Sequence, residues 1–561
     1  MGRVYYLIMS APRPAPGHSL RNGLLVIALA LGVTVSGIYF WWSRQAQPPM
    51  GPEPVEMARE GAPMLTPARD FHLDRETTSS AEAFNLYVEG MGLASRLPLQ
   101  AAARFRKAVM LDSAFAPAHY RLALASVALS RRDEAAAEVA AAIRQQDRLP
   151  EPYRTMAPIL ALYVAGSFDL AAAGLRGALE RYPGEPDLQY IAGAICAGSC
   201  DHFDPNGAVE HFEQALEADP ENAAAREGLR VASEMKGMND YSLRRALEYQ
   251  SRNTGRIDSV AEVGRVRIAR GEYGDAIEAA DEVVRQGEDP FAHGLAPAFI
   301  LAGHHQQIAS MYDPEIERTN TAGTNAVTHL HAGINDVWLG RFGKAIEHFE
   351  RGSEFTPGAW ERSRKALFYL LAGRTHALTG RTREADMAFE AAQQVAGPRP
   401  ILEYCLGMNK LNSGNTQDAE RAARRLAQET RVSQPGWNEP WRLLLSGEIA
   451  LASGQTARAI DEFRQAWQLE KPLATDCIAG YVDAYFLDAL GRAYLTAGKA
   501  QDALAAFEQI RALGQKALHQ PEISVMALYH SGVALEMLGR QRDAKELFER
   551  FSETKAPIPI P

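Results

Sequence analysis

The sequence predicts an all-α protein: a solenoid of about thirteen antiparallel helix pairs, preceded by one transmembrane helix. Three observations predict this architecture. A spacing of glycine, alanine and phenylalanine recurs along most of the chain, and an uncharged apolar run lies near the N-terminus. The third is the length of 561 residues, which is too long for one compact core but suits an array whose units pack on their neighbours.

The repeating unit is clearest in residues 487–510, which read as two short helices with a tight turn between them. Gly491 lies on the apolar stripe of the first helix, where a side chain would hold the two helices apart. Gly498 ends that helix, and we expect it in the left-handed conformation. Ala503 and Phe507 recur at helical spacing in the second helix, so Phe507 is predicted to fill the space beside Gly491.

The same spacing recurs along the chain. A step of seven residues separates Gly264 from Gly271, Gly333 from Gly340, Gly373 from Gly380, Gly407 from Gly414, Gly447 from Gly454, and Gly532 from Gly539. Five residues after each second glycine comes an alanine: Ala276, Ala345, Ala385, Ala419, Ala459, Ala503 or Ala544. Four residues later there is often a phenylalanine: Phe349, Phe389, Phe463, Phe507 or Phe548. Each spacing has a packing reason, which predicts stacked helix pairs.

This order of glycine, glycine, alanine and an aromatic residue, with a later Pro220 or Pro357, resembles the tetratricopeptide repeat, or TPR. The resemblance implies a TPR solenoid that is divergent in residues 80–325 and regular in residues 326–555. The best matches in the divergent part are Ala101, Phe105 and Ala108; Ala171, Leu175, Ala178 and Pro183; and Ala208, Phe212, Ala215 and Pro220. Residues 290–327 match worst, so we expect a break or bend there.

A narrower resemblance rests on three stretches. Residues 77–90 read Thr-Thr-Ser-Ser-Ala-Glu-Ala-Phe-Asn-Leu-Tyr-Val-Glu-Gly, residues 149–153 Leu-Pro-Glu-Pro-Tyr, and residues 162–168 Leu-Tyr-Val-Ala-Gly-Ser-Phe. Together they resemble the TPR regions of bacterial membrane receptors, in which a kinase, cyclase or winged-helix domain usually precedes a membrane anchor. The sequence has no Gly-rich phosphate loop, His-Arg-Asp or Asp-Phe-Gly, so the resemblance does not extend to an effector domain. The hydroxyls and glutamate of residues 77–83 also predict a capped helix start.

Residues 23–42 carry no charge over a length that spans a bilayer as a helix, and aromatic residues gather at their C-terminal end. A cleaved signal peptide is the alternative, although its apolar run would be shorter. We therefore expect a short cytoplasmic segment (1–22), one transmembrane helix (23–42), a Pro-rich linker (43–79) and a C-terminal tail (556–561). The arginine distribution favours the inner membrane, with the N-terminus cytoplasmic and the array periplasmic or extracytoplasmic.

Composition and the reactive residues exclude several classes of function. A formal net charge of -10 argues against a general nucleic-acid binder. Cys196, Cys200 and His202 are close enough for a metal site or a small disulfide loop, but Cys196 also reads as a small core residue. His329 and His331 read as structural residues of a first helix. No metal or other cofactor, catalytic residue or small-molecule substrate is expected, so we do not expect an enzyme.

The resemblance to TPR arrays implies a concave groove lined by the first helices, and the repeat phase shows which positions face it. In the regular region these are Tyr404, Met408, Trp441, Glu448, Tyr485, Asp488, Arg492, Met526 and Tyr529. Aromatic residues, methionine and arginine are enriched at protein interfaces, so the groove is a candidate site for a protein or peptide partner. Equally, some of these residues could cover seams between repeats.

The sequence is compatible with two functions. The first is a membrane-anchored scaffold that captures a peptide in the groove. The second is a sensory or regulatory subunit of a membrane signalling system whose effector, a kinase or transcription regulator, lies on another chain.

Overall fold

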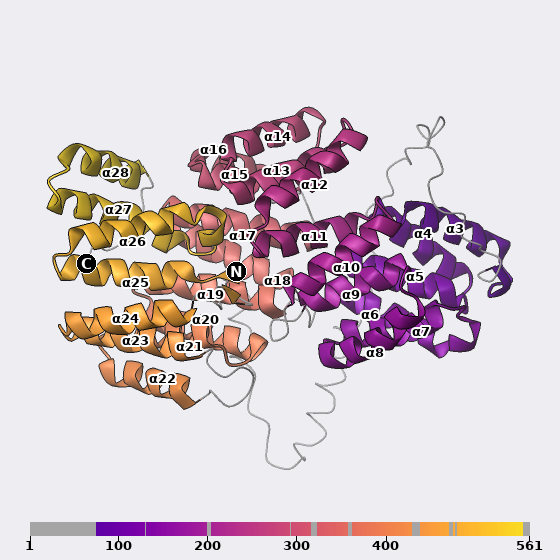
Figure 1. Ribbon diagram of the computed structural model, residues 1–561, viewed down its shortest axis with the longest axis horizontal. Helices are drawn as coiled ribbons and strands as arrows, with labels where there is room; N and C mark the ends of the chain where they lie inside the picture. Colours follow the sequence, from indigo (N-terminus) through magenta and orange to yellow (C-terminus); the bar gives the residue numbers. More distant parts are fainter. Residues whose placement is uncertain are drawn as a thin grey trace, which may run out of the picture. The chain divides into compact units, whose positions relative to one another are not determined.

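The computed structural model describes residues 75–553, apart from 130, 199–203, 292, 316–321, 357–361, 429–437, 471–474 and 477–479. These residues form 26 α-helices, α3 to α28, which alternate as the first and second helices of thirteen pairs (Figure 1). The all-helical architecture and the number of pairs agree with the spacing of the glycines. Only two short strands, β1 (Thr475–Asp476) and β2 (Gly480–Tyr481), pair within the described residues.

The first six pairs follow one another along the chain. They are α3 (Ala81–Leu93) and α4 (Pro98–Leu111), α5 (Ala116–Ala128) and α6 (Arg132–Arg144), α7 (Tyr153–Val164) and α8 (Phe168–Arg181), α9 (Pro186–Gly198) and α10 (Pro205–Ala218), α11 (Ala223–Met235) and α12 (Asn239–Arg252), and α13 (Ile257–Arg270) and α14 (Tyr273–Arg285). A short 3-10 helix, η1 (Gln146–Arg148), precedes α7.

Seven further pairs complete the array. They are α15 (Ala296–Leu301) and α16 (His305–Glu315), α17 (Ala322–Trp338) and α18 (Phe342–Glu354), α19 (Arg362–Leu378) and α20 (Thr382–Ala396), α21 (Pro400–Asn412) and α22 (Thr416–Gln428), α23 (Asn438–Ala452) and α24 (Thr456–Glu470), α25 (Asp483–Thr496) and α26 (Ala500–Ala512), and α27 (Pro521–Met537) and α28 (Gln541–Glu553). A second 3-10 helix, η3 (Gly514–Ala517), lies between α26 and α27.

The contact between glycine and phenylalanine holds the regular pairs together. A Cβ atom added at the glycine of the first helix would lie 2.4–2.6 Å from a ring carbon of the second helix, in the pairs Gly333–Phe349, Gly373–Phe389, Gly447–Phe463, Gly491–Phe507 and Gly532–Phe548. Each ring therefore occupies the space that the glycine leaves, as the sequence predicts.

Two glycines of this set meet a leucine instead. The second helices that follow Gly264 and Gly407 carry alanine at the phenylalanine position. There, an added Cβ would lie 2.7 Å from Leu295 and 2.5 Å from Leu445, both of which come from the next pair along the chain. A neighbouring pair thus supplies the apolar volume that the second helix lacks.

Two helix ends have the capping residues that the sequence predicts. Gly498 has a φ of 73°, a left-handed conformation that side chains other than glycine rarely adopt, and it ends the first helix of its pair. At the start of the array, the Ser80 hydroxyl accepts a hydrogen bond from the Ala83 amide at 3.1 Å. Ser80 is therefore the N-cap of α3, with Glu82 in the first turn, as the sequence predicts.

The apolar core of the described residues divides into separate clusters. Two of them, whose residues interleave on α5, cover 83–125 and 116–232, and a third covers 261–547. Between the last two lies only a small cluster of Ala246, Val263 and Val266. The core is therefore interrupted at α12, the second helix of the pair α11–α12.

The apolar core continues through the described part of residues 290–327, where the sequence predicts a break or bend of the array. Phe291, Leu295, Phe299 and Ile308 are buried in the same cluster that continues to the last pair. The stretch lacks repeat glycines but keeps large apolar side chains, which is sufficient for a continuous core.

Several predicted features lie outside the described residues: the segment 1–22, the membrane span 23–42, most of the linker 43–79 and the tail 556–561. Within the part of the chain that is described, the helices are all too short or too polar to cross a bilayer.

Candidate partner-binding surface

The nine predicted groove residues lie on four consecutive first helices. Tyr404 and Met408 belong to α21, and Trp441 and Glu448 belong to α23. The helix α25 carries Tyr485, Asp488 and Arg492, and α27 carries Met526 and Tyr529. The structure brings six of them, from α21, α23 and α25, into two groups of direct contacts, one aromatic and one charged.

The aromatic members of this set pack on one another. The ring centroids of Tyr404 and Trp441 are 5.4 Å apart, those of Trp441 and Tyr485 are 5.6 Å apart, and those of Tyr404 and Tyr485 are 5.9 Å apart. All three side chains are at most 5% exposed. Three first helices thus meet through one buried aromatic cluster, in geometries that favour edge-to-face contact.

The charged members form an ion-pair network beside this cluster. The Arg492 guanidinium donates to both carboxylate oxygens of Glu448, with Nη1 3.1 Å from Oε2, and its Nε donates to Asp488 at 2.8 Å. Burial alone would lower the pKa of Arg492, but the carboxylates of Glu448 and Asp488 raise it. Burial raises the pKa of Tyr404 well above its usual range, and Glu448 adds to this effect.

The remaining members are partly exposed. Met408 and Met526 pack against the edge of the apolar core with part of each side chain open to solvent. Tyr529 faces its own second helix instead, with its ring centroid 5.7 Å from that of Phe548 and 5.3 Å from that of Phe551. The predicted set therefore contains a buried centre, two half-buried methionines and one residue that packs within its pair.

Arg374 of α19 was not among the predicted residues, yet it closes the buried centre. Its guanidinium carbon lies 5.0 Å from the ring centroid of Tyr485, its Nη1 donates to the His519 carbonyl at 2.8 Å, and it forms an ion pair with Glu522. Arg374 directly follows Gly373, as Arg492 follows Gly491. An arginine directly after the first glycine of a pair is therefore the sequence signal by which Arg374 could have been predicted.

These contacts join first helices that are far apart in sequence. Arg374 on α19 binds the start of α27, and α17 also packs against α27. The inner surface of the first helices between α17 and α27 therefore closes on itself. This closure explains the burial of Tyr404, Trp441 and Tyr485.

The first five pairs contain a similar centre. The rings of Tyr120 and Tyr153 stack with centroids 4.8 Å apart, and the Arg121 guanidinium carbon lies 4.8 Å from the Tyr153 ring. Arg121 Nη1 is 2.5 Å from an oxygen of Asp187 on α9. An arginine, tyrosine rings and a carboxylate again connect three first helices.

Between these two centres, α11 carries ion pairs along its own length. Arg230 Nη2 lies 2.6 Å from Glu227 and its Nη1 lies 2.6 Å from Glu234. Arg230 stands seven residues before Gly237, where the regular pairs have their first glycine, and Ala246 stands at the phenylalanine position. The pair thus has a large polar residue in place of the glycine and a small one in place of the ring.

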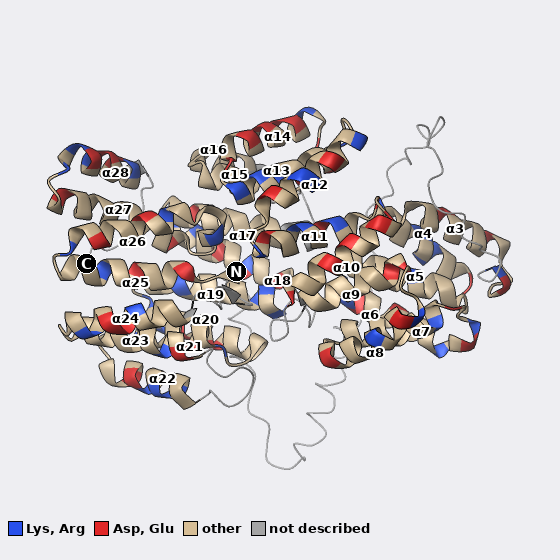
Figure 2. Ribbon diagram, viewed as in Figure 1, with Lys and Arg blue, Asp and Glu red and all other residues tan. Residues whose placement is uncertain are grey.

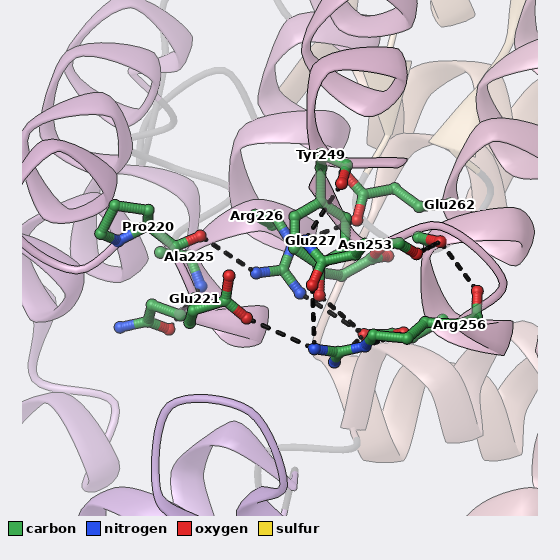
Figure 3. A network of polar contacts seen from close by, with 12 residues as sticks. Pro220, Glu221, Ala225, Arg226, Glu227, Tyr249, Asn253, Arg256 and Glu262 are labelled. Atoms are coloured by element: carbon green, nitrogen blue, oxygen red, sulfur yellow. Dashed lines mark hydrogen bonds and ion pairs between the residues drawn. The ribbon is translucent and has the colours of Figure 1, made fainter. Parts of the chain in front are cut away.

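Arg226 connects α11 to the next pair (Figure 3). Its guanidinium carbon lies 3.6 Å from the Tyr249 ring centroid, its Nε donates to Glu262 at 3.2 Å, and its Nη1 donates to the Pro220 carbonyl at 3.3 Å. Burial raises the pKa of Glu262, while Arg226 opposes that rise. Basic and acidic residues are interspersed along α11, α12 and α13 (Figure 2).

The structure describes some of the cysteine and histidine candidates. Cys196 is half-buried, and burial, with Asp204 and Glu210 nearby, raises the pKa of its thiol to about 11. Cys200 and His202 lie outside the described residues, and so does any contact between them and Cys196. His331 is buried on α17, and its Nδ1 has no hydrogen-bond partner in the described part of the chain.

The sequence of the last two pairs matches a known family. Residues 489–554, which include Gly491, Phe507 and most of α25 to α28, match the tetratricopeptide repeat family model. This part of the chain carries the sequence of the repeat. The described helices form a TPR-like solenoid, a fold that in general mediates protein–protein interaction. No curated protein matches the sequence.

Solved structures with a similar arrangement of helices include the APC/C hetero-tetramer Cut9–Hcn1, at 15% identity and a TM-score of 0.29, with 86% of this chain and 99% of that chain covered. Human IFIT1 dimers with m7Gppp-AAAA and with PPP-AAAA are each 14% identical, with TM-scores of 0.37 and 0.38. The matches cover 79% and 81% of the TPR chain, and 90% and 93% of the IFIT1 chains.

Proposed function

We propose that the protein is a membrane-anchored TPR scaffold that captures a protein or peptide partner on the inner surface of α21 to α27. The observations that support this most are two half-buried methionines, Met408 on α21 and Met526 on α27, and the Arg492 ion pairs on α25. Methionine adapts its shape to different partners, and a guanidinium binds carboxylates with defined geometry.

In this proposal the buried aromatic residues support the site, and the half-buried methionines contact the partner. Tyr404, Trp441 and Tyr485 are almost fully buried in the described structure, so they fix the relative positions of three first helices. Met408 and Met526 have side-chain area left for contact with a partner. Residues at the centre of an interface contribute most of its binding energy, and rigid supports lower the entropy cost of binding.

The test separates binding from stability. The partner is first identified by crosslinking the intact protein in its membrane fraction, and its affinity is then measured on purified protein. Changing Met408 and Met526 together to Ala should weaken that affinity by about 2 kcal/mol, while the midpoint of thermal unfolding moves little. Met110, which is 80% exposed on α4, provides a matched Met→Ala control that should leave the affinity unchanged.

Unchanged affinity in the double variant would place the partner elsewhere on the array. Tyr485 and Arg492 are unsuitable for this test, because both are held in buried contacts and their removal would also lower stability. An adjacent kinase or regulator gene would favour the sensory or regulatory subunit instead.

The membrane anchor is a separate part of the proposal, and the uncharged run at residues 23–42 supports it. Alkaline carbonate should leave the protein in the membrane pellet, and protease added to spheroplasts should digest the array. Release into the soluble fraction would contradict the anchor, and protection from protease would reverse the proposed orientation.

A further inference from the structure

A cavity of about 250 Å³ lies at the interruption of the apolar core, between α10, α11, α12 and α13. Its apolar wall consists of Leu216, Pro220 and Leu229 together with the ring of Tyr249. At roughly 30 Å³ for each water molecule in the liquid, this volume equals about eight waters. The cavity is therefore large enough for one apolar side chain and smaller than the usual pocket for a drug-sized ligand.

The cavity lies beside a helix pair that departs from the repeat pattern. The regular pairs place a phenylalanine of the second helix between their two helices, whereas α12 carries Ala246 at that position. Ala246 packs against Val263 and Val266 of the next pair and does not line the cavity. The cavity is lined instead by Arg230, which stands at the position of the repeat glycine and pairs with Glu227 and Glu234.

One polar group inside the cavity is unused. Ser242 lines the cavity and is 4% exposed, and its hydroxyl forms no hydrogen bond with any described residue. Because Ser242 lines the cavity, its hydroxyl can donate to or accept from a ligand there. The buried Arg226, by contrast, is already engaged by Glu262, Tyr249 and Pro220.

The rim of the cavity offers hydrogen-bond donors. Arg245 uses Nη1 for an exposed contact with Glu248 at 3.1 Å, and its other N–H groups form no bond with described residues. Arg252, seven residues along the same helix, forms neither an ion pair nor a hydrogen bond with any described residue. Glu217 also lines the cavity and is exposed, so it opposes an acidic ligand at one side. Two guanidiniums with unused donors are suited to a carboxylate.

We propose that this cavity is a second partner-binding site, which accepts one apolar side chain of a peptide segment with acidic residues beside it. The apolar side chain lies against Leu229 and Tyr249, which line the cavity. The peptide backbone reaches the Ser242 hydroxyl, and the flanking carboxylates pair with Arg245 and Arg252. The site is separate from the half-buried methionines of α21 and α27 and does not depend on them.

The test uses a defined probe with the full-length protein in detergent. The probe is the peptide acetyl-Gly-Ser-Asp-Phe-Glu-Asp-Gly-Ser-amide with a fluorine on the Phe ring, observed by fluorine NMR. Saturable binding is expected, and it should be lost when Phe is replaced by Ala or the acidic residues by Lys. Ser242→Leu, which places an apolar side chain in the cavity, should weaken binding at least tenfold.

The rim provides matched variants. Arg252→Gln should weaken probe binding about fivefold, the scale of an exposed ion pair, and Glu217→Gln should strengthen it about twofold by removing the opposing charge. Arg244→Gln is the control, because Arg244 is a neighbour on α12 that does not line the cavity. It should leave binding unchanged.

Three results would overturn the proposal: no saturable binding, equal binding of the basic peptide, or full binding in both Ser242→Leu and Arg252→Gln. Probe binding that disappears in the Met408→Ala and Met526→Ala variant would assign the probe to α21–α27 and contradict this site. Failure of that methionine variant to affect its own partner, with probe binding intact, would contradict only the function proposed above.

Discussion

The pairs α25–α26 and α11–α12 perform the same task, joining two antiparallel helices, with opposite chemistry. In α25–α26 the glycine at residue 491 lets the Phe507 ring lie between the helices. In α11–α12 the corresponding positions hold Arg230 and Ala246, and the arginine is paired with two glutamates of its own helix. The first solution is apolar and continuous with its neighbours, whereas the second interrupts the core.

The difference shows what the repeat pattern contributes. An apolar contact between helices adds to the contacts on either side, so the core of residues 261–547 is continuous. Buried ion pairs contribute little net stability, because the cost of removing charges from water offsets much of their attraction. The pair α11–α12 is therefore expected to be the weakest link between two stable regions, and also the one with room for a ligand.

The largest expected effect is at Gly491. Changing Gly491 to Leu should lower the free energy of unfolding by about 3 kcal/mol, because even a Cβ atom there would lie 2.5 Å from the Phe507 ring. Chemical denaturation of the purified array measures this. Gly343, where an added Cβ meets no atom within 4 Å, is the control, and Gly343→Ala should be neutral or slightly stabilising. Similar costs at both glycines would refute the packing account.

A double-mutant cycle tests whether α11–α12 is a modified version of the regular pair. Arg230→Gly and Ala246→Phe should each destabilise by about 2 kcal/mol, the first by leaving Glu227 and Glu234 unpaired and the second by crowding Arg230. The double variant should cost about 2 kcal/mol less than the sum, because the new ring can occupy the space that Arg230 vacates. Additive costs would mean that the two positions do not face each other.

Acid should weaken the region that contains α17. Burial, with His519 nearby, lowers the pKa of His331 to about 3, below the value of about 6.5 in an unfolded chain. Between these values the unfolded state binds the additional proton, so stability falls as the pH falls below about 6.5. The loss between pH 7 and pH 5 should be about 2 kcal/mol, and His331→Leu should reduce this dependence. An unchanged pH dependence in the variant would assign it to other groups.

The smallest expected effect is that of salt on the stability of the two kinds of helix pair. Raising NaCl from 0.1 to 1 M screens partly exposed ion pairs and strengthens apolar burial slightly. Hydrogen exchange should therefore show α11 to α13 opening more readily, by about 1 kcal/mol, while protection of α25 and α26 stays level or rises. Equal changes in both regions would indicate that the ion pairs at α11–α12 are not important for its stability.

The sequence predicts the local parts of this structure well. The glycine and phenylalanine spacing gives the helix pairs, their number and the contact at Gly491, because each depends on residues fewer than twenty positions apart. The repeat spacing does not predict where the apolar core is interrupted. Residues 290–327 lack the glycines but keep Phe291 and Phe299 in the core, whereas α11–α12 lacks the apolar volume itself.

The candidate site was predictable only in part. The repeat phase places Tyr404, Trp441 and Tyr485 on the inner face, where the structure finds them packed together. Their burial depends on Arg374 and on the contact between α17 and α27, which are separated by many helices, and no local spacing encodes such a contact. The role of the nine residues in partner binding stays a prediction.

The contacts of Arg374 also affect how this array can change in length. An array held only by neighbour contacts can lose or gain a terminal repeat with little effect on the others. Here Arg374 is 145 residues from His519, whose carbonyl it binds, and its carboxylate partner Glu522 belongs to the last pair. Deleting α27 and α28 would leave the buried guanidinium of Arg374 without its counter-ion, and α19 lies seven helices before α26, the new last helix. The last pair is therefore structurally tied to the middle of the chain, so terminal repeats could not be lost one by one without a compensating change at Arg374.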